Sequence, residues 1–284
     1  MEEAPLPRTR IAPTPSGYLH AGNAVNFLLT RRLADHFGAR LLLRIDDLDT
    51  ERARPAYLQE VFEGLAWLGI HWDEGPRDAR DHVANWSQTR RLDRYQALAD
   101  ALRVRGHLYA CTCSRRSIRQ HAAPGNACPC KGRDLPFDTP DTAWRLLVPQ
   151  GTIVRVPRLF GGEEEVDVAL AMGDAVLRQR DGRPAYQLAS LADDVDRGIT
   201  FIVRGMDLLP STACQRHIAE LLGLEAFLRV RFAHHPLLLD EAGEKLSKSA
   251  GAYALRSIRE AGTGPEHLIA KADALFKALA AGAF

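Results

Sequence analysis

The feature that most constrains the fold is the alternation of short apolar runs with amphipathic segments over the first 105 residues. Short strands are expected at Arg8–Ala12 and Leu41–Ile45. Apolar residues at three- and four-residue spacing predict helices over Asn23–Phe37 and Tyr57–Leu68, and a third helix is expected over Ser87–Arg105. Strands that alternate with helices are typical of a parallel sheet joined by crossover helices. The pattern therefore predicts an α/β fold.

This alternation stops after residue 105 and resumes near residue 185. The intervening stretch is rich in Pro, Gly and Cys, and it contains three expected strands: Trp144–Val148, Ile153–Val156 and Val166–Leu170. The second alternating stretch predicts a helix over Ala185–Val195, a strand over Ile199–Val203, a helix over Thr212–Leu222 and a strand toward Pro236–Leu239. We expect one sheet domain formed by residues 1–105 and 185–250. An α+β insertion at 106–184 would split this domain, and a short helical segment would follow at 251–284.

The overall charge limits the classes of partner. The chain has 284 residues, with 37 Lys+Arg against 36 Asp+Glu, a formal net charge of +1. A protein that coats DNA is usually far more basic, so any nucleic-acid contact is expected to be local. No apolar run reaches the ~18–20 residues of a membrane-spanning helix, and the N-terminus has no apolar signal core. We therefore expect a cytoplasmic protein with no membrane and no DNA partner.

Four of the five cysteines form two close pairs, Cys111/Cys113 and Cys128/Cys130. In a cytoplasmic chain, paired cysteines indicate a metal more often than a disulfide. Four thiolates with no open position favour a structural zinc site. The C-x-C spacing is tighter than the usual C-x₂-C, and His121 is an alternative ligand. The remaining Cys214 is expected to be a small core residue.

Two polar segments have groups suited to phosphate. The first runs from Pro13 to Asn23, between the first strand and the first helix, and contains His20 and Gly22. Gly22 lets the backbone approach a ligand, and N–H groups at a helix start favour phosphate. The second, Lys245-Leu246-Ser247-Lys248-Ser249, places two cations and two hydroxyls together. Each segment alone has an ordinary alternative, a structural histidine or a solvated loop. There is no G-x-G-x-x-G after a strand and no G-x-x-x-x-G-K-[ST] motif.

Together and in this order, the two segments resemble the "HIGH" and "KMSKS" signatures of class I aminoacyl-tRNA synthetases. Three further stretches are similar to the glutamyl enzymes: R-I-A-P-T-P-S-G-Y-L-H-A-G from Arg10, R-I-D-D-L-D from Arg44, and Y-Q-L-A…D-D…V-R-G-M-D-L-L from Tyr186. The resemblance covers about residues 8–250. It implies a Rossmann-like parallel sheet split by a zinc-bearing insertion.

Within that family, the chain most resembles the short paralogues of glutamyl-tRNA synthetase that lack an anticodon-binding domain. Only 35 residues follow Ser249, so no such domain is expected. The resemblance implies activation of L-glutamate by ATP with Mg²⁺, then transfer to queuosine in the anticodon of tRNA(Asp), by a monomer containing structural Zn²⁺. Two alternatives stay open: a truncated glutamyl-tRNA synthetase that charges a tRNA 3′ end, and a non-catalytic zinc-containing RNA-binding paralogue.

The resemblance also assigns roles to residues. His20, Asn23, Lys245 and Lys248 would be catalytic, and His20, Gly22, Asn23 and Lys248 would bind ATP. Arginine suits two-pronged carboxylate recognition, so Arg10 and Arg204 are candidates for the carboxylates of glutamate. The other expected glutamate-binding residues are Ala12, Pro13, Thr14, Asp46 and Tyr186. Arg204 has an alternative role as an ordinary ion pair with Asp207 or Asp194.

One position departs from the family pattern. Asp46 stands where the family usually has Glu, the group thought to hold the substrate's amino group. Losing one methylene retracts the carboxylate by roughly 1.5 Å. This change is compatible either with glutamate, held with the help of a backbone shift or a water, or with a different amino acid. We expect glutamate because Arg10 and Arg204 are both in place.

Overall fold

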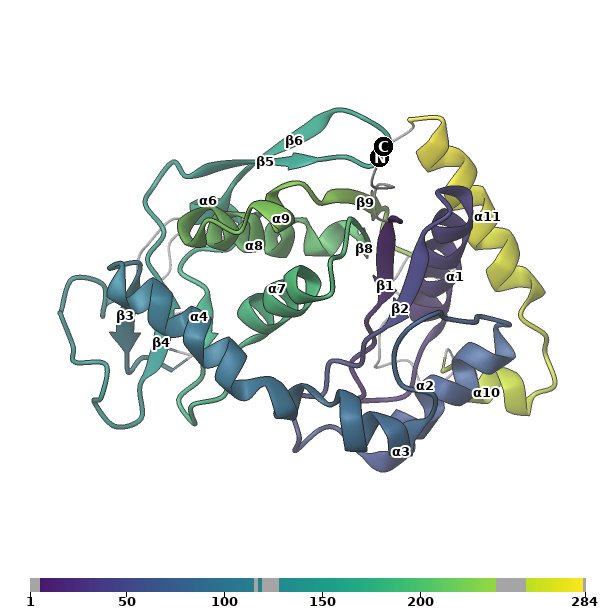
Figure 1. The fold of residues 1–284 in the computed structure, drawn as a ribbon, viewed down its shortest axis with the longest axis horizontal. Coiled ribbons are helices and arrows are strands. Elements are labelled where there is room, and N and C mark those ends of the chain that lie inside the picture. The colour runs from purple at the N-terminus through teal and green to yellow at the C-terminus, as the bar shows by residue number, and fades with distance from the viewer. Residues whose placement is uncertain (1–5, 115–116, 119–127, 239–253, 283–284) are drawn as a thin grey trace, which may run out of the picture.

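Two parallel strand pairs, from distant parts of the chain, lie side by side and organise the fold (Figure 1). In the computed structural model, β1 (Arg8–Ile11) pairs with β2 (Arg40–Leu43), and β8 (Phe201–Gly205) pairs with β9 (Arg231–His235), both in parallel. The two pairs meet where the backbone N–H of Thr200 donates to the carbonyl of Arg8 at 2.9 Å. The predicted parallel sheet is thus confirmed. The structure describes residues 6–114, 117–118, 128–238 and 254–282.

The helices of the first half follow the apolar periodicity closely. The crossover from β1 to β2 contains α1 (Ala21–His36), and α2 (Pro55–Trp67) follows β2 in the chain. The third predicted helix starts later than expected, because Ser87 caps a 3₁₀ turn (Gln88–Arg91) by accepting a hydrogen bond from the N–H of Thr89. The regular helix α4 therefore spans Leu92–Val104, preceded by α3 (Ala79–Asp81) and a π-helical turn (His82–Trp86).

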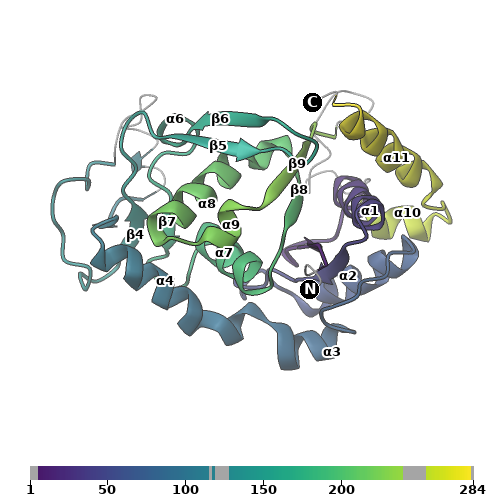
Figure 2. The same cartoon turned by 45° about the horizontal axis from the view of Figure 1, so that its top comes forward.

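In the described part of residues 106–184, the predicted insertion, five strands form two antiparallel units. Three strands form a sheet in the order β3–β4–β7: Leu108–Cys111, Ala143–Leu146 and Val176–Arg178. The other two, β5 (Ile153–Pro157) and β6 (Glu163–Asp167), form a hairpin beside α8 (Figure 2). The predicted strand Val166–Leu170 is wrong in its second half. Asp167 caps the short helix α6 (Val168–Ala171) by accepting from the N–H of Leu170, which ends the strand.

The second half of the sheet domain matches its predicted order of elements. The helices α7 (Tyr186–Asp196), α8 (Leu209–Leu222) and α9 (Glu225–Leu228) lie on the side of β8 and β9 opposite to α1 (Figures 1 and 2), and a 3₁₀ turn (Met206–Leu208) precedes α8. The last strand ends at His235, earlier than predicted. Pro236 follows it and has no N–H to continue the ladder.

Two helices, α10 (Leu255–Glu260) and α11 (Glu266–Ala280), follow near the C-terminus. Figures 1 and 2 show α11 lying along α1. Its buried residues Leu268, Ala272 and Leu279 join the core of β1, β2, α1 and α2. Within the described ranges, no helix combines the length and the apolar character that crossing a membrane requires.

A second core crosses the boundaries of the insertion. Leu146 and Val154 from the insertion pack in one cluster with Leu102 of α4, Leu188 of α7 and Ile218 of α8. Residues of the insertion are therefore anchored to α4, α7 and α8 by buried apolar contacts. The four paired cysteines belong to a separate small cluster at its far end.

Gly75 gives a stability prediction at the edge of β2. Its φ is +117°, and a Cβ there would lie 2.3 Å from the carbonyl oxygen of Leu43. We expect Gly75→Ala to lower the free energy of unfolding by about 3 kcal/mol or more, because the backbone at Gly75 or Leu43 must move to relieve the clash. Gly69 (φ +67°) has open space around it, so Gly69→Ala should cost only about 1 kcal/mol. Urea unfolding followed by circular dichroism compares the two; equal losses would contradict the steric explanation.

Candidate active site

Two side chains from the segment that runs from Pro13 to Asn23 cap the start of α1. Nδ1 of His20 accepts from the backbone N–H of Asn23 at 3.3 Å, and Oδ1 of Asn23 accepts from the backbone N–H of His20 at 3.1 Å. This reciprocal cap fixes both side chains. In the neutral ring, an accepting Nδ1 leaves the proton on Nε2. The Asn23 amide likewise keeps its NH₂ group as a donor.

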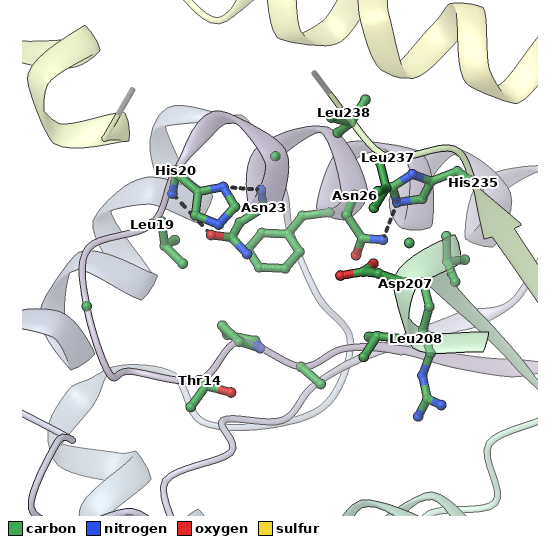
Figure 3. Close-up of a pocket in the computed structure, with 18 of the residues that line it drawn as sticks. Thr14, Leu19, His20, Asn23, Asn26, Asp207, Leu208, His235, Leu237 and Leu238 are labelled. Atoms are coloured by element: carbon green, nitrogen blue, oxygen red, sulfur yellow. Dashed lines mark hydrogen bonds between the residues drawn. The ribbon is translucent and has the colours of Figure 1, made fainter. Parts of the chain in front are cut away.

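A cavity of about 300 Å³ opens between this helix start and the carboxyl ends of β1, β8 and β9 (Figure 3). Ligands of open α/β sheets bind at such an edge. The cavity wall includes nine of the predicted site residues: Arg10, Ala12, Pro13, Thr14, His20, Gly22, Asn23, Tyr186 and Arg204. Lys245 and Lys248 lie outside the described residues.

Arg204 presents two unpaired donors at the end of β8. Its side chain is 3% exposed, and Nη1 donates to Thr212 at 3.1 Å and to Gln215 at 2.7 Å. Within the described part of the chain, Nε and Nη2 are buried without a hydrogen-bond acceptor. These two nitrogens form one edge of the guanidinium, which matches a carboxylate with two parallel hydrogen bonds. Asp194 lies 3.8 Å from Nη2, an ion pair longer than a hydrogen bond.

Arg10 and Arg44 are linked by the same carboxylate of Asp194. Oδ1 of Asp194 accepts from Nε of Arg10 at 2.9 Å and from Nη1 of Arg44 at 2.6 Å. Burial lowers the pKa of Arg10, and the nearby Asp194 opposes that shift. Arg10 lines the cavity, whereas Arg44 lies behind the wall.

Asp46 lies outside the cavity wall, unlike the other described residues assigned to glutamate. Its carboxylate accepts from Nε and Nη2 of Arg44 at 2.7 and 3.2 Å, and from Nε2 of Gln88 at 3.3 Å. The shorter side chain is thus engaged by the protein itself. A substrate amino group would have to share this carboxylate with Arg44.

The cavity residues that were not among the predicted site residues include Asn26, Asp207 and His235. Nδ1 of His235 faces the carbonyl of Pro236 at 2.8 Å and must be protonated, which leaves Nε2 to accept from Nδ2 of Asn26 at 3.0 Å. Burial lowers the pKa of His235, in keeping with a neutral ring. Asn26 stands one turn beyond the capped helix start, which was its available sequence signal. His235 ends β9, but the strand was predicted toward Pro236–Leu239, so no sequence signal marked this residue.

His234, which precedes His235 in β9, leads to a prediction about the pH dependence of stability. Burial, aided by nearby Arg204, lowers its pKa from 6.5 to about 3. Between these pH values the unfolded state binds a proton that the native state does not. Stability should therefore fall by about 1.4 kcal/mol per pH unit as pH drops below 6.5. His234→Gln should flatten this acid limb relative to wild type in urea unfolding at pH 7, 6 and 5. Parallel curves for the two proteins would contradict the prediction.

The four paired cysteines converge at the far end of the insertion. Their sulfur atoms all lie within 4.8 Å of one another, with Cys111–Cys128 at 3.2 Å and Cys113–Cys130 at 3.5 Å. Tetrahedral zinc with Zn–S bonds of about 2.3 Å requires sulfurs roughly 3.8 Å apart. None of the five cysteines forms a disulfide. The donor set therefore fits a zinc ion, while His121 lies outside the described residues.

A second cavity of about 820 Å³ lies between this cluster and the first cavity. Its wall includes Cys113, Arg145 and Arg180 from the insertion, and it meets the first cavity at Tyr186. The described wall of the first cavity has no residue from 106–184. The two cavities are thus built by different parts of the chain and share one tyrosine.

Comparison with known proteins identifies the family of the chain. Residues 7–137 and 160–277 match the catalytic domain of class I tRNA synthetases for glutamate and glutamine ("E and Q"). A curated glutamyl-Q tRNA(Asp) synthetase of Nitratidesulfovibrio vulgaris is 38% identical over 269 residues, which is 90% of this chain and 82% of that protein. Another from Bordetella bronchiseptica is 43% identical over 255 residues, 87% of this chain and 76% of that protein.

A solved structure shares the fold. The crystal structure of a glutamate tRNA ligase from Elizabethkingia meningosepticum superposes with a TM-score of 0.71 at 28% sequence identity. The match covers 87% of this chain and 53% of that chain, so this chain spans about half the length of that solved relative.

Proposed function

The chain belongs to the class I tRNA synthetases for glutamate and glutamine, and we propose that it activates L-glutamate with ATP and transfers it to queuosine in the anticodon of tRNA(Asp). One observation carries the first step. One wall of a single cavity contains Arg204, whose guanidinium donors suit a carboxylate, and another wall contains the capped start of α1. An amino acid and a nucleoside triphosphate need these two kinds of group.

In the first step, the α-carboxylate of glutamate attacks the α-phosphorus of ATP. A carboxylate–phosphorus bond forms, the bond to the bridging oxygen breaks, and pyrophosphate leaves with that electron pair. Arg10 and Arg204 would orient the two carboxylates of glutamate, and Tyr186 would add a hydrogen bond. Nε2 of His20, the amide of Asn23 and N–H groups beside Gly22 would stabilise the charge developing on the phosphate.

Other groups complete this proposal. Lys245 and Lys248 would neutralise the polyphosphate. Mg²⁺, which this family uses, would be held mainly by phosphate oxygens and would offset their charge. Asp207 is the one acidic side chain on the described wall of the cavity. Asp46 would receive the substrate's amino group while paired with Arg44.

In the second step, a hydroxyl oxygen of the queuosine cyclopentenediol attacks the activated carbonyl carbon and forms an ester. The bond from that carbon to the phosphate oxygen breaks, AMP leaves with the electron pair, and the hydroxyl proton passes to the AMP phosphate or to water. The second cavity supports this assignment because it reaches the first cavity at Tyr186. Arg145, Gln179 and Arg180 line it and provide donors for a polar nucleoside. The relatives named glutamyl-Q tRNA(Asp) synthetase support the choice of queuosine.

We further propose the domain division 1–105, 106–184, 185–250 and 251–284, with structural Zn²⁺ held by Cys111, Cys113, Cys128 and Cys130. The separate walls of the two cavities support this division. The zinc would brace the end of the insertion and has no place in the chemistry.

The likeness to a glutamate tRNA ligase favours a second candidate, charging of a tRNA 3′ end. Amino-acid-dependent exchange of pyrophosphate into ATP tests the first step. Exchange with glutamate is expected, and exchange only with aspartate or glutamine would contradict it. Labelled glutamate is then offered to two forms of tRNA(Asp). One carries queuosine but lacks the terminal adenosine, and the other is intact but unmodified. Labelling of the first alone is expected, and labelling of the second alone would establish the rival.

A further inference from the structure

Asp194 is the carboxylate on which three guanidinium groups converge. It lies on α7 and is fully buried, with 0% of its side chain exposed. Oδ1 accepts hydrogen bonds from Arg10 and Arg44, and Oδ2 lies 3.8 Å from Nη2 of Arg204. Burial raises the pKa of Asp194, but the three arginines outweigh burial and leave that pKa below its usual range. The residue is therefore an anion in the folded protein.

The charges around Asp194 do not cancel. Arg10, Arg44 and Arg204 contribute three positive charges, whereas Asp194 and Asp46 contribute two negative charges. The adjacent Asp193 is balanced by Arg91, with Nε of Arg91 at 2.7 Å. One positive charge is left in excess within this buried group, and a ligand carboxylate would neutralise it. Asp207, on the described wall of the cavity, lies outside the group and adds one negative charge.

The geometry shows how the excess charge is directed. Asp194 engages Nε of Arg10 and Nη1 of Arg44, yet it stands too far from Arg204 to take its free edge. Nε and Nη2 of Arg204 thus have no acceptor among the described residues and can donate to a ligand carboxylate. The charge of Asp194 at the same time restricts the conformations of the Arg204 side chain. Arg44 is also held by Asp46 and by Oγ of Ser190, so it anchors Asp194 from behind.

We propose that Asp194 is a positioning residue, which holds Arg10 and Arg204 at the separation and orientation needed to grip the carboxylates of the amino acid. The proposal rests on the proposed glutamate activation. Asp194 acts through the two arginines and does not touch the substrate. A shift of about 1 Å in a substrate-positioning group can reduce a rate by about 100-fold.

The test is Asp194→Asn, which keeps the shape of the side chain and removes its charge. In the pyrophosphate-exchange assay, we expect kcat/KM for glutamate to fall about 10- to 100-fold, mostly through KM. The KM for ATP should stay within about twofold, because the ATP groups lie at α1. If Asp194 only stabilised the fold, its replacement would not raise the KM for glutamate while leaving the KM for ATP unchanged.

Asp193→Asn is the matched control. Asp193 is the preceding residue of α7 and is 2% exposed. It accepts from Arg91, Tyr95 and Gln88, and its carboxylate lies 4.0 Å from Nε of Arg44. Among the described residues, no hydrogen bond or ion pair joins it to Arg10 or Arg204. We expect this variant to lose thermal stability while its KM for glutamate stays within about twofold of wild type. An unchanged glutamate KM in Asp194→Asn, or equal rises in both variants, would overturn the proposal. If wild type shows no glutamate-dependent exchange, the proposed function itself fails, and this outcome is distinguishable from the other two.

Discussion

Replacing Arg204 by glutamine should reduce kcat/KM for glutamate by about 10²- to 10³-fold in pyrophosphate exchange. The variant loses the buried edge formed by Nε and Nη2, which has no acceptor among the described residues. Hydrogen bonds to a charged group contribute about 1.5–3 kcal/mol each, and a factor of ten corresponds to about 1.4 kcal/mol. Two such bonds account for the expected loss. Arg204→Lys keeps the charge but not the paired donors, so it should fall between wild type and Arg204→Gln.

Arg216→Gln is the control for removing a buried arginine. Arg216 lies on α8, is 8% exposed and donates to the backbone carbonyls of Arg155 and Leu228. It is absent from the described wall of the cavity. This variant should be less stable and should keep the wild-type KM for glutamate. A loss below about threefold in Arg204→Gln, or a similar loss in Arg216→Gln, would remove Arg204 from substrate recognition.

The sequence predicted those elements whose own residues determine them. The helices α1, α2 and α7 show apolar spacing and lie within two residues of the predicted bounds. The strands β3 and β7 have no such signal. They are three or four residues long and form by pairing with β4, across gaps of about 30 residues. Cross-strand pairing of this kind is a tertiary property that a local pattern does not contain.

The site was predictable to the extent that it follows short motifs. Nine residues named from the motifs line one cavity, although they come from segments about 180 residues apart. The position of Asp46 was not predictable, because it depends on Arg44 and Gln88 competing for its carboxylate. Asn26 and His235 were missed for a similar reason. Their pairing at 3.0 Å joins α1 to β9 and has no trace in either local segment.

The confirmed α/β fold also explains why motifs so far apart act together. The N–H of Thr200 binds the carbonyl of Arg8 and brings the end of β8 beside the end of β1. Arg10 and Arg204 then share Asp194, which reaches them from α7. The insertion can therefore occupy the middle of the sequence without separating the two arginines.

The cysteine cluster should bind one equivalent of zinc, and Cys111→Ser should remove it. Cys111, Cys128 and Cys130 are buried, and the four sulfurs already lie within 4.8 Å. A hydroxyl is a poor zinc ligand, and the binding energy of a structural zinc is folding energy for the segment it closes. We expect the melting temperature to fall by about 10 °C. Cys214→Ala is the matched control, because Cys214 is a buried thiol on α8 outside the cluster.

The two reaction steps should respond differently to this loss of zinc. Cys113 lines the second cavity, whereas the described wall of the first cavity contains no residue of the insertion. Glutamate-dependent pyrophosphate exchange by Cys111→Ser should therefore stay within about threefold of wild type at a temperature where the variant is folded. Transfer to queuosine-containing tRNA should fall at least about tenfold, since a 1 Å shift of a positioning group has effects of this size. Equal losses in the two steps would show that the cluster supports the whole catalytic domain, and zinc retained by the Cys128→Ser/Cys130→Ser double variant would refute the ligand assignment.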